Sequence, residues 1–168
     1  MIERIAVLSL GSNLGDREAT LLAAVRDIAT LDGVEALRAS GIVETPALKP
    51  DGVDAAAPAY LNAIVLVATA HEPHELLALL NGVEQSHGRV RGERWGDRTL
   101  DIDIVTLDGV ELNEDGLTLP HPRAAERAFV LEPWLQLDPD ATLAGYGRAD
   151  ALLASLDAVT HYPAEPLL

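Results

Sequence analysis

The amino-acid sequence predicts an α+β fold in which two helices pack on one face of an antiparallel sheet. The main observation is the order of the expected elements, because strand-like and helix-like segments follow one another as β-α-β-β-α-β. The second is composition, since 48% of the 168 residues are apolar and 23% are charged, as in globular domains. The third is that no repeat or linker divides the sequence, which predicts one domain over residues 1–160. This order is that of the split-βαβ, or ferredoxin-like, arrangement, followed here by a C-terminal hairpin and short helices.

The first expected elements are a buried strand and an amphipathic helix. Residues 5–10 form an apolar run of strand length, and the turn-rich residues 11–16 after it are expected to form a structural turn. Asp16 is a candidate N-cap, and Asp32-Gly33 is expected to end the helix. Between them, apolar residues recur at helical spacing: Leu21, Leu22, Val25, Ile28 and Leu31. A second strand is expected over about residues 34–43.

The segment from Thr45 to Tyr60 is predicted to be a long loop. It contains three prolines and shows no clear period, and long loops inside compact domains often act as lids. The continuous apolar run over residues 63–68 then predicts a central strand. Pro73 is expected to open a second helix, which should end near Gly88.

The last strand of the core is expected over residues 100–107. Asp108-Gly109 is a tight-turn signal, so a short return strand is expected over residues 110–112. A helical segment is expected around residues 123–127, and a final helix near residues 148–156. Residues 161–168 are expected to form a loosely held tail.

Charge and composition limit the possible partners. The net charge of −15 argues against general nucleic-acid binding, because a polyanion would be repelled. The chain has no apolar run of the roughly 18 residues that span a membrane. It also lacks a signal-peptide pattern and has no cysteine, which favours a cytoplasmic location. We also expect a monomer.

Positive charge is concentrated in one segment. Only 12 residues are Lys or Arg, and Arg89, Arg91, Arg94 and Arg98 lie close together. Arginine forms bidentate pairs with phosphate oxygens, so this segment is a candidate site for a compact anion such as a nucleotide phosphate. A solvated surface loop is the alternative.

Asp101 and Asp103 lie two positions apart in the last core strand. Alternation places both carboxylates on one face, about 7 Å apart at the backbone. At a separation of roughly 6 Å they would repel each other by about 3 kcal/mol at an effective dielectric constant of about 20. A hard cation offsets that cost, and Mg²⁺ is usually held by one or two carboxylates together with phosphates and waters. A solvated strand face, paired with arginines, is the alternative.

Carboxylates beside phosphate-binding arginines are typical of a phosphoryl-transfer site, where catalysis depends on positioning and charge stabilisation. Neither a Walker motif nor a protein-kinase signature occurs in the sequence. Residues 11–16 resemble a phosphate loop superficially but lack its lysine.

The sequence resembles the 6-hydroxymethyl-7,8-dihydropterin pyrophosphokinase family of folate biosynthesis over roughly residues 2–157. The most specific block is Arg-Trp-Gly-x-Arg-x-x-Asp-x-Asp, which runs from Arg94 to Asp103. The other matching segments are residues 10–15, 44–46, 60–63, 88–91 and 119–123, with Arg127 and Phe129 at the family spacing. The resemblance implies transfer of pyrophosphate from ATP to the pterin hydroxymethyl group, releasing AMP.

The resemblance also implies roles for individual residues. Asp101 and Asp103 would hold two Mg²⁺ ions that bridge the ATP phosphates, and Arg89 and Arg98 would face the transferring phosphates as catalytic residues. Further ATP contacts would come from Glu84, Arg91, Ile104, Thr118, His121 and Arg127. The pterin pocket would be formed by Thr45, Ala47, Leu48, Tyr60, Asn62, Trp95 and Phe129. From the residues alone, His121 could instead cap a turn and Phe129 could belong to the core.

Some positions depart from the family pattern. Asp97 replaces a proline or small residue, and Asn81 replaces a common glutamine near the nucleotide. Pro122 and Gly116 differ from the enteric-bacterial form, and the Thr45–Tyr60 loop is longer than the short version of this loop in the family.

Two other classes of protein fit the Asp-x-Asp strand. One is a metal-dependent phosphohydrolase or nucleotidyltransferase, and the other is a non-catalytic module that senses a nucleotide.

Overall fold

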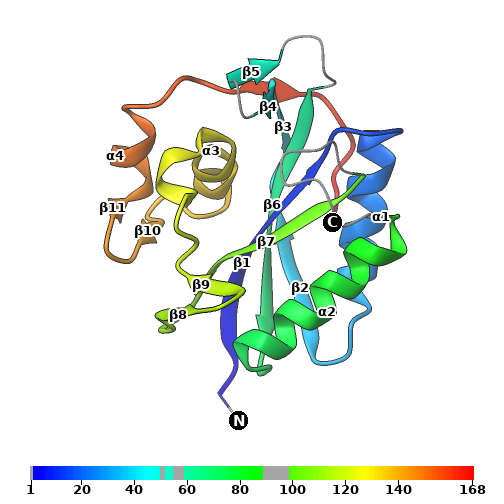
Figure 1. Cartoon of the computed structure of the whole chain (residues 1–168), viewed down its shortest axis with the longest axis vertical. Helices are drawn as coiled ribbons and strands as arrows, with labels where there is room; N and C mark the ends of the chain where they lie inside the picture. The colour runs from blue at the N-terminus through cyan, green and yellow to red at the C-terminus, as the bar shows by residue number, and fades with distance from the viewer. Residues whose placement is uncertain (1, 50–51, 55–58, 89–98) are drawn as a thin grey trace.

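The computed structural model describes residues 2–49, 52–54, 59–88 and 99–168. The core elements follow one another in the predicted order. They are β1 (Arg4–Ser12), α1 (Arg17–Ala29), β2 (Val34–Ala39), β3 (Ile42–Thr45), β6 (Tyr60–Thr69), α2 (Pro73–Ser86) and β7 (Asp101–Leu107). The strand pairings are antiparallel, and α1 and α2 lie on the same face of the sheet (Figure 1). The predicted α+β, ferredoxin-like class is confirmed.

The sheet is centred on β6 and β1. Its strand order is β12-β3-β6-β1-β7, with β2 also paired to β6. Alternate residues of these strands, such as Leu8 and Leu10 of β1, are fully buried against the helices. The apolar stripe of α1 meets them through Leu21 and Ile28, as its spacing predicted. Asp16 caps this helix, because its side chain accepts a hydrogen bond from the Ala19 amide.

A second core lies on the opposite face of the sheet. There α3 (Ala128–Leu137), η1 (Ala124–Glu126), α4 (Ala149–Leu153) and the hairpin of β10 (Thr142–Leu143) and β11 (Gly147–Arg148) cover the strands (Figure 1). Val7, Ile64 and Val105 supply the strand side of this core, and α3 supplies Leu131 and Trp134. The cluster does not extend to Gly11, Asn62 or Asp101 farther along the same face. That part of the face carries the candidate site.

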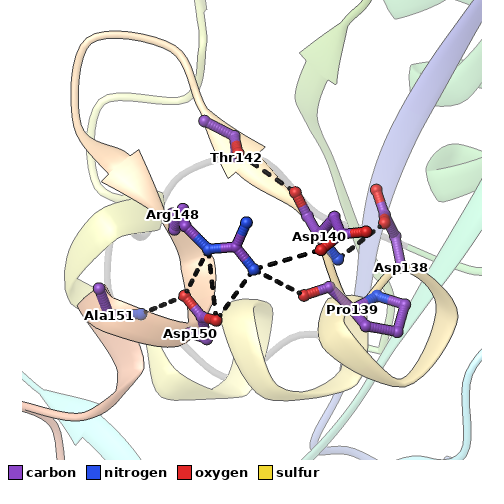
Figure 2. Close-up of polar contacts among 7 residues, drawn as sticks. All are labelled: Asp138, Pro139, Asp140, Thr142, Arg148, Asp150 and Ala151. Carbon is purple, nitrogen blue, oxygen red and sulfur yellow. Dashed lines mark hydrogen bonds and ion pairs between the residues drawn. The ribbon is translucent and has the colours of Figure 1, made fainter.

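Arg148 joins the segments around the small hairpin. Its guanidinium donates hydrogen bonds to the carboxylates of Asp140 and Asp150 and to the carbonyl of Pro139 (Figure 2). Since these groups are exposed, the contacts fix geometry more than they add stability.

Two segments differ from the sequence prediction before β6. The strand expected over residues 34–43 is divided at Ser40-Gly41 into β2 and β3. Ser40 is buried, and its hydroxyl accepts a hydrogen bond from the Ile64 amide, which replaces a main-chain ladder bond. The Thr45–Tyr60 segment is not structureless, because β4 (Ala47–Lys49) and β5 (Gly52–Asp54) form a hairpin.

The C-terminal part also departs from expectation. The turn at Asp108-Gly109 is present, but the prediction of a return strand after it over residues 110–112 is wrong. Instead, β8 (Leu112–Glu114) pairs with β9 (Leu117–Leu119). The sequence did not predict α3. The tail is not loosely held throughout, since β12 (Thr160–Tyr162) pairs with β3 and Leu167 is buried in the core. Within the described residues, none of the helices combines the length and apolar character needed to span a membrane.

Candidate functional site

The carboxylates of β7 share one face of the sheet, as alternation predicted. In the β1–β7 ladder, Asp101 lies opposite Gly11 and Asp103 lies opposite Ser9. Ile102 and Ile104 point the other way, and each is 3% exposed within the core formed with α1 and α2. The strand therefore anchors itself through its isoleucines and presents its aspartates on the opposite face.

Two side chains from the segment before α3 approach the β7 carboxylates. The Asp103 Oδ2 atom lies 3.9 Å from His121 Nε2 and 3.8 Å from Arg127 Nη1. The segment is attached to β7 directly, because the His121 amide donates a 2.8 Å hydrogen bond to the Val105 carbonyl. This main-chain bond brings together residues that are far apart in the sequence.

His121 is held as a neutral ring with a defined orientation. It follows a cis Leu119-Pro120 peptide bond, and its Nδ1 atom accepts a 3.1 Å hydrogen bond from the Arg123 amide. Burial, followed by the positive charge of Arg127, lowers the pKa of His121 to about 4, although Asp101 opposes the shift. At neutral pH the proton therefore resides on Nε2, the atom that faces Asp103.

Arg127 connects this cluster to α3. Its guanidinium lies 5.6 Å from the centre of the Phe129 ring, a cation–π distance. Burial lowers the pKa of Arg127, while Asp103 opposes that shift, and the group remains a cation at neutral pH. Phe129 is only partly buried against the second core. The ring therefore packs against this core and remains partly accessible, and its expected role in the pterin pocket stays a prediction.

Three of the residues expected to bind the pterin, Thr45, Tyr60 and Asn62, lie on β3 and β6 of the main sheet. Asn62 of β6 is 4% exposed, and its Nδ2 atom donates a 3.1 Å hydrogen bond to Thr45 Oγ1. Thr45 lies opposite Tyr60 in the β3–β6 ladder. Gly11 lies opposite Asn62 on one side and Asp101 on the other. The β1 main chain therefore joins the Asn62 group to the β7 carboxylates. Ala47 and Leu48 belong to β4.

The structure describes the surroundings of three residues that are expected to contact the nucleotide. Glu84 of α2 is 2% exposed and accepts a 2.7 Å hydrogen bond from the Ile102 amide. The Ile104 side chain is in the core, so only its main chain can face a ligand. Thr118 of β9 lies with its hydroxyl 3.5 Å from Asn113 Oδ1. Four further expected site residues lie outside the described residues: Arg89, Arg91, Trp95 and Arg98.

The sequence interpretation missed one residue beside this site. Arg17, the first residue of α1, donates hydrogen bonds from Nη1 to Glu44 Oε2 at 3.1 Å and to the Ala59 carbonyl at 2.8 Å. Glu44 and Ala59 precede Thr45 and Tyr60, so Arg17 ties together the two ends of the segment between them. The only signal in the sequence was an arginine in the first turn of a helix, where the helix dipole disfavours a cation.

The donor set fits a hard cation that shares an anionic ligand. Among the described residues, no group of three His, Cys, Asp or Glu side chains is arranged to hold a metal ion by itself. Two carboxylates on one face, with Asp103 at 36% side-chain exposure, match the one or two carboxylates that Mg²⁺ takes when phosphates complete its shell. A neutral imidazole and a guanidinium beside them suit phosphate oxygens.

Comparison with known proteins gives a consistent result. A family model described as 7,8-dihydro-6-hydroxymethylpterin-pyrophosphokinase (HPPK) matches residues 7–139. The chain is 40% identical over 152 residues to a 2-amino-4-hydroxy-6-hydroxymethyldihydropteridine pyrophosphokinase of Methylorubrum extorquens, covering 90% of this chain and 93% of that protein. It is 44% identical over 165 residues to the enzyme of the same name from Mycobacterium leprae, covering 90% of this chain and 82% of that protein.

A solved structure supports the fold. Wild-type HPPK-DHPS of Plasmodium falciparum, crystallised with SDX-DHP, superposes with a TM-score of 0.63 over 90% of this chain at 16% sequence identity. The chain spans 43% of that protein's length, so the similarity concerns one part of it. At 16% sequence identity, this similarity supports the fold only.

Proposed function

Because the chain belongs to the 7,8-dihydro-6-hydroxymethylpterin-pyrophosphokinase family, we propose that it transfers pyrophosphate from ATP to 6-hydroxymethyl-7,8-dihydropterin. The products are AMP and the pterin diphosphate, in folate biosynthesis. The observation that carries the proposal is the grouping of Asp103 with His121 and Arg127, on the same strand face as Asp101. It combines oxygen ligands for a cation with donors for phosphate.

In this proposal Asp101 and Asp103 hold Mg²⁺, with two ions expected when ATP is bound. Bound magnesium would neutralise part of the phosphate charge and orient the triphosphate. The surrounding residues fit that role, because Asp103 lies near the His121 imidazole and the Arg127 guanidinium. Both groups can donate hydrogen bonds to phosphate oxygens once the Asp103 carboxylate binds a cation.

The reaction is an in-line displacement at the β-phosphorus of ATP. The hydroxymethyl oxygen of the pterin forms the new bond to phosphorus, the bond from the β-phosphorus to the oxygen of the α-phosphate breaks, and AMP leaves. The substrate hydroxyl proton passes to solvent. His121 donates a hydrogen bond from Nε2 to a phosphate oxygen, and Arg127 adds a positive charge. We assign Arg89 and Arg98 to the transferring phosphates, with Arg91, Glu84, Ile104 and Thr118 as further nucleotide contacts.

In this proposal the pterin ring binds at the end of the site formed by Asn62 and its neighbours on β3 and β6. Asn62 offers an amide that can satisfy the donor and acceptor edge of the heterocycle, and its bond to Thr45 fixes that amide. Tyr60 and Phe129 provide aromatic faces for a flat ring. Ala47, Leu48 and Trp95 complete the proposed pocket.

We also propose that the enzyme works as a cytoplasmic monomer with one domain over residues 1–160. Sedimentation of the pure protein tests its oligomeric state.

The decisive experiment measures AMP release with ATP and magnesium, with and without the pterin alcohol. AMP should form only when the pterin is present, whereas steady ATP hydrolysis without it would favour a phosphohydrolase. Asp101→Asn and Asp103→Asn should each lower kcat by about a hundredfold or more, with the fold intact by circular dichroism. Asp150→Asn, an exposed carboxylate on α4, is the matched control and should keep full activity. Undiminished turnover in both β7 variants would refute the proposal.

A further inference from the structure

The strand β12 lies beside the strand that leads into the Thr45–Tyr60 segment. It forms one edge of the main sheet and pairs with β3, where Thr160 lies opposite Glu44 (Figure 1). On its other side Glu44 lies opposite Leu61 of β6. The residue directly before Thr45 therefore has a strand on each side, and β12 supplies one of them.

Two neighbouring side chains attach β12 to opposite faces of the sheet. His161 Nε2 lies 3.1 Å from Glu132 Oε1 of α3, which covers the face of the second core. Tyr162 points the other way, as strand alternation requires, and packs half-buried against the core formed with α1 and α2. Leu167 follows in the same core and is 5% exposed. Because β12 is held from both faces, the position of the Tyr162 ring is well defined.

The Tyr162 ring lies beside the guanidinium of Arg17. The guanidinium carbon is 6.0 Å from the centre of the ring, the distance up to which a cation and an aromatic face attract each other. Nη1 of the same guanidinium donates the two hydrogen bonds to Glu44 and to the Ala59 carbonyl. The Arg17 side chain is 25% exposed and has several rotatable bonds, so a ring against its guanidinium restricts the positions that it can adopt.

Strand pairing by itself does not require an aromatic side chain at position 162. Main-chain hydrogen bonds from β12 are enough to cover the edge of β3, and most residues can supply them. A ring adds a face for the Arg17 cation, which an aliphatic side chain of similar size lacks. The contact with Arg17 therefore gives the ring of Tyr162 a role beyond covering the sheet.

We propose that Tyr162 is a positioning residue that acts through Arg17 on the acceptor site. It holds the guanidinium on Glu44 and Ala59, so that the two strand ends next to them keep their relative positions. This inference rests on the proposed function, since it assumes that the residues that follow Glu44 and Ala59 bind the pterin. It concerns the acceptor, because this series of contacts does not include the β7 carboxylates or the segment before α3, to which the triphosphate is assigned.

Tyr162→Leu and Tyr162→Phe test the proposal by steady-state kinetics of AMP release. Leucine keeps an apolar side chain for the core but removes the ring, so the KM for 6-hydroxymethyl-7,8-dihydropterin should rise roughly 2- to 5-fold. The KM for ATP and kcat should be unchanged. Phenylalanine keeps the ring and should retain the KM values of the parent. Tyr146→Leu is the matched control, because it makes the same change at a 48% exposed residue between β10 and β11, and it should leave all three constants unchanged.

A double-mutant cycle tests whether the ring acts through Arg17. Once Arg17→Met has removed the guanidinium, the addition of Tyr162→Leu should cause no further rise in the KM for the pterin, because the ring has lost the group that it positions. If instead the two increases in KM multiply in the double variant, the ring acts independently of Arg17 and the inference is wrong.

The remaining outcomes separate the inference from the proposed function. An unchanged pterin KM in Tyr162→Leu, beside a parent that turns over, overturns the inference and leaves the proposed function intact. The inference is also overturned if the KM values for pterin and ATP rise equally, if Tyr162→Phe is as impaired as Tyr162→Leu, or if Tyr162→Leu is unfolded by circular dichroism, since β12 would then only support the sheet. A parent protein that releases no AMP with the pterin refutes the proposed function, and the inference with it.

Discussion

The partly buried ring of His121 makes the stability of the ligand-free protein depend on pH. In the unfolded chain this imidazole titrates near its ordinary pKa of 6.5, whereas in the folded protein burial and Arg127 lower the pKa to about 4. Between these values the unfolded state binds more protons, so the free energy of unfolding falls as the pH falls. The contribution is intact above pH 6.5. Its loss amounts to about 1 kcal/mol at pH 6, about 2 kcal/mol at pH 5 and about 3 kcal/mol at pH 4.

His121→Gln isolates this contribution, since glutamine is polar but does not titrate. Urea unfolding of both proteins, without metal or nucleotide, should be followed by circular dichroism at pH 7, 6, 5 and 4. All other titrating groups are common to both proteins, so their effects cancel in the difference between the two free energies of unfolding. That difference should shift in favour of the variant by about 3 kcal/mol from pH 7 to pH 4. A difference that stays constant over this range would show that the ring titrates normally and is not held neutral.

Three further substitutions test other parts of the structure. Arg17→Met keeps the apolar stem but removes the hydrogen-bond donors to Glu44 and Ala59. The KM for the pterin should therefore rise roughly tenfold, equivalent to roughly 1.4 kcal/mol. A steady-state assay measures it, with the KM for ATP as the internal control. Leu131→Ala opens a cavity in the second core, where Leu131 is 0% exposed, and should lower the free energy of unfolding by about 2–5 kcal/mol in urea. Arg148→Ala removes the exposed network of Figure 2 and should leave the melting temperature nearly unchanged; a large drop would mean that this network supports the fold.

Much of the core could be predicted because its signals are local. The helical spacing that includes Leu21 and Ile28 identified the buried stripe of α1, and Asp16 was recognised as its cap. Alternation alone placed Asp101 and Asp103 on one face of β7. These inferences depend only on side-chain periodicity, which tertiary contacts did not override here.

The C-terminal half was harder to predict for an identifiable reason. The segment that forms α3 is apolar around most of its circumference and contains Pro133, so it shows neither a clear period nor an uninterrupted helical signal. It is helical because Val130, Leu131 and Trp134 pack on the second face of the sheet. Similarly, the break at Ser40 depends on its bond to Ile64, a contact that no pattern in the sequence reveals.

The candidate site was predictable only in part. The resemblance to a family, not the spacing, suggested that His121 and Arg127 act with Asp103. Their proximity depends on the main-chain bond from His121 to Val105. Gly11 was assigned to a turn because a glycine followed by turn-forming residues is the usual signature of one. Only the strand register reveals that it lies between Asn62 and Asp101.

The distances around Asp103 are compatible with the role that we propose for its carboxylate in both the free and the ligand-bound site. At 3.8 and 3.9 Å, its contacts with Arg127 and His121 are electrostatic, because direct hydrogen bonds to these nitrogens would be about 2.7–3.2 Å long. All three side chains are also partly exposed, so solvent screens the attraction and keeps the cost of separating them low. If magnesium and a triphosphate bind as we propose, the carboxylate would turn to the cation while the imidazole and guanidinium would turn to phosphate oxygens. Shorter contacts at the same positions, shielded from solvent, would oppose that exchange, so the long distances within the cluster favour its proposed use.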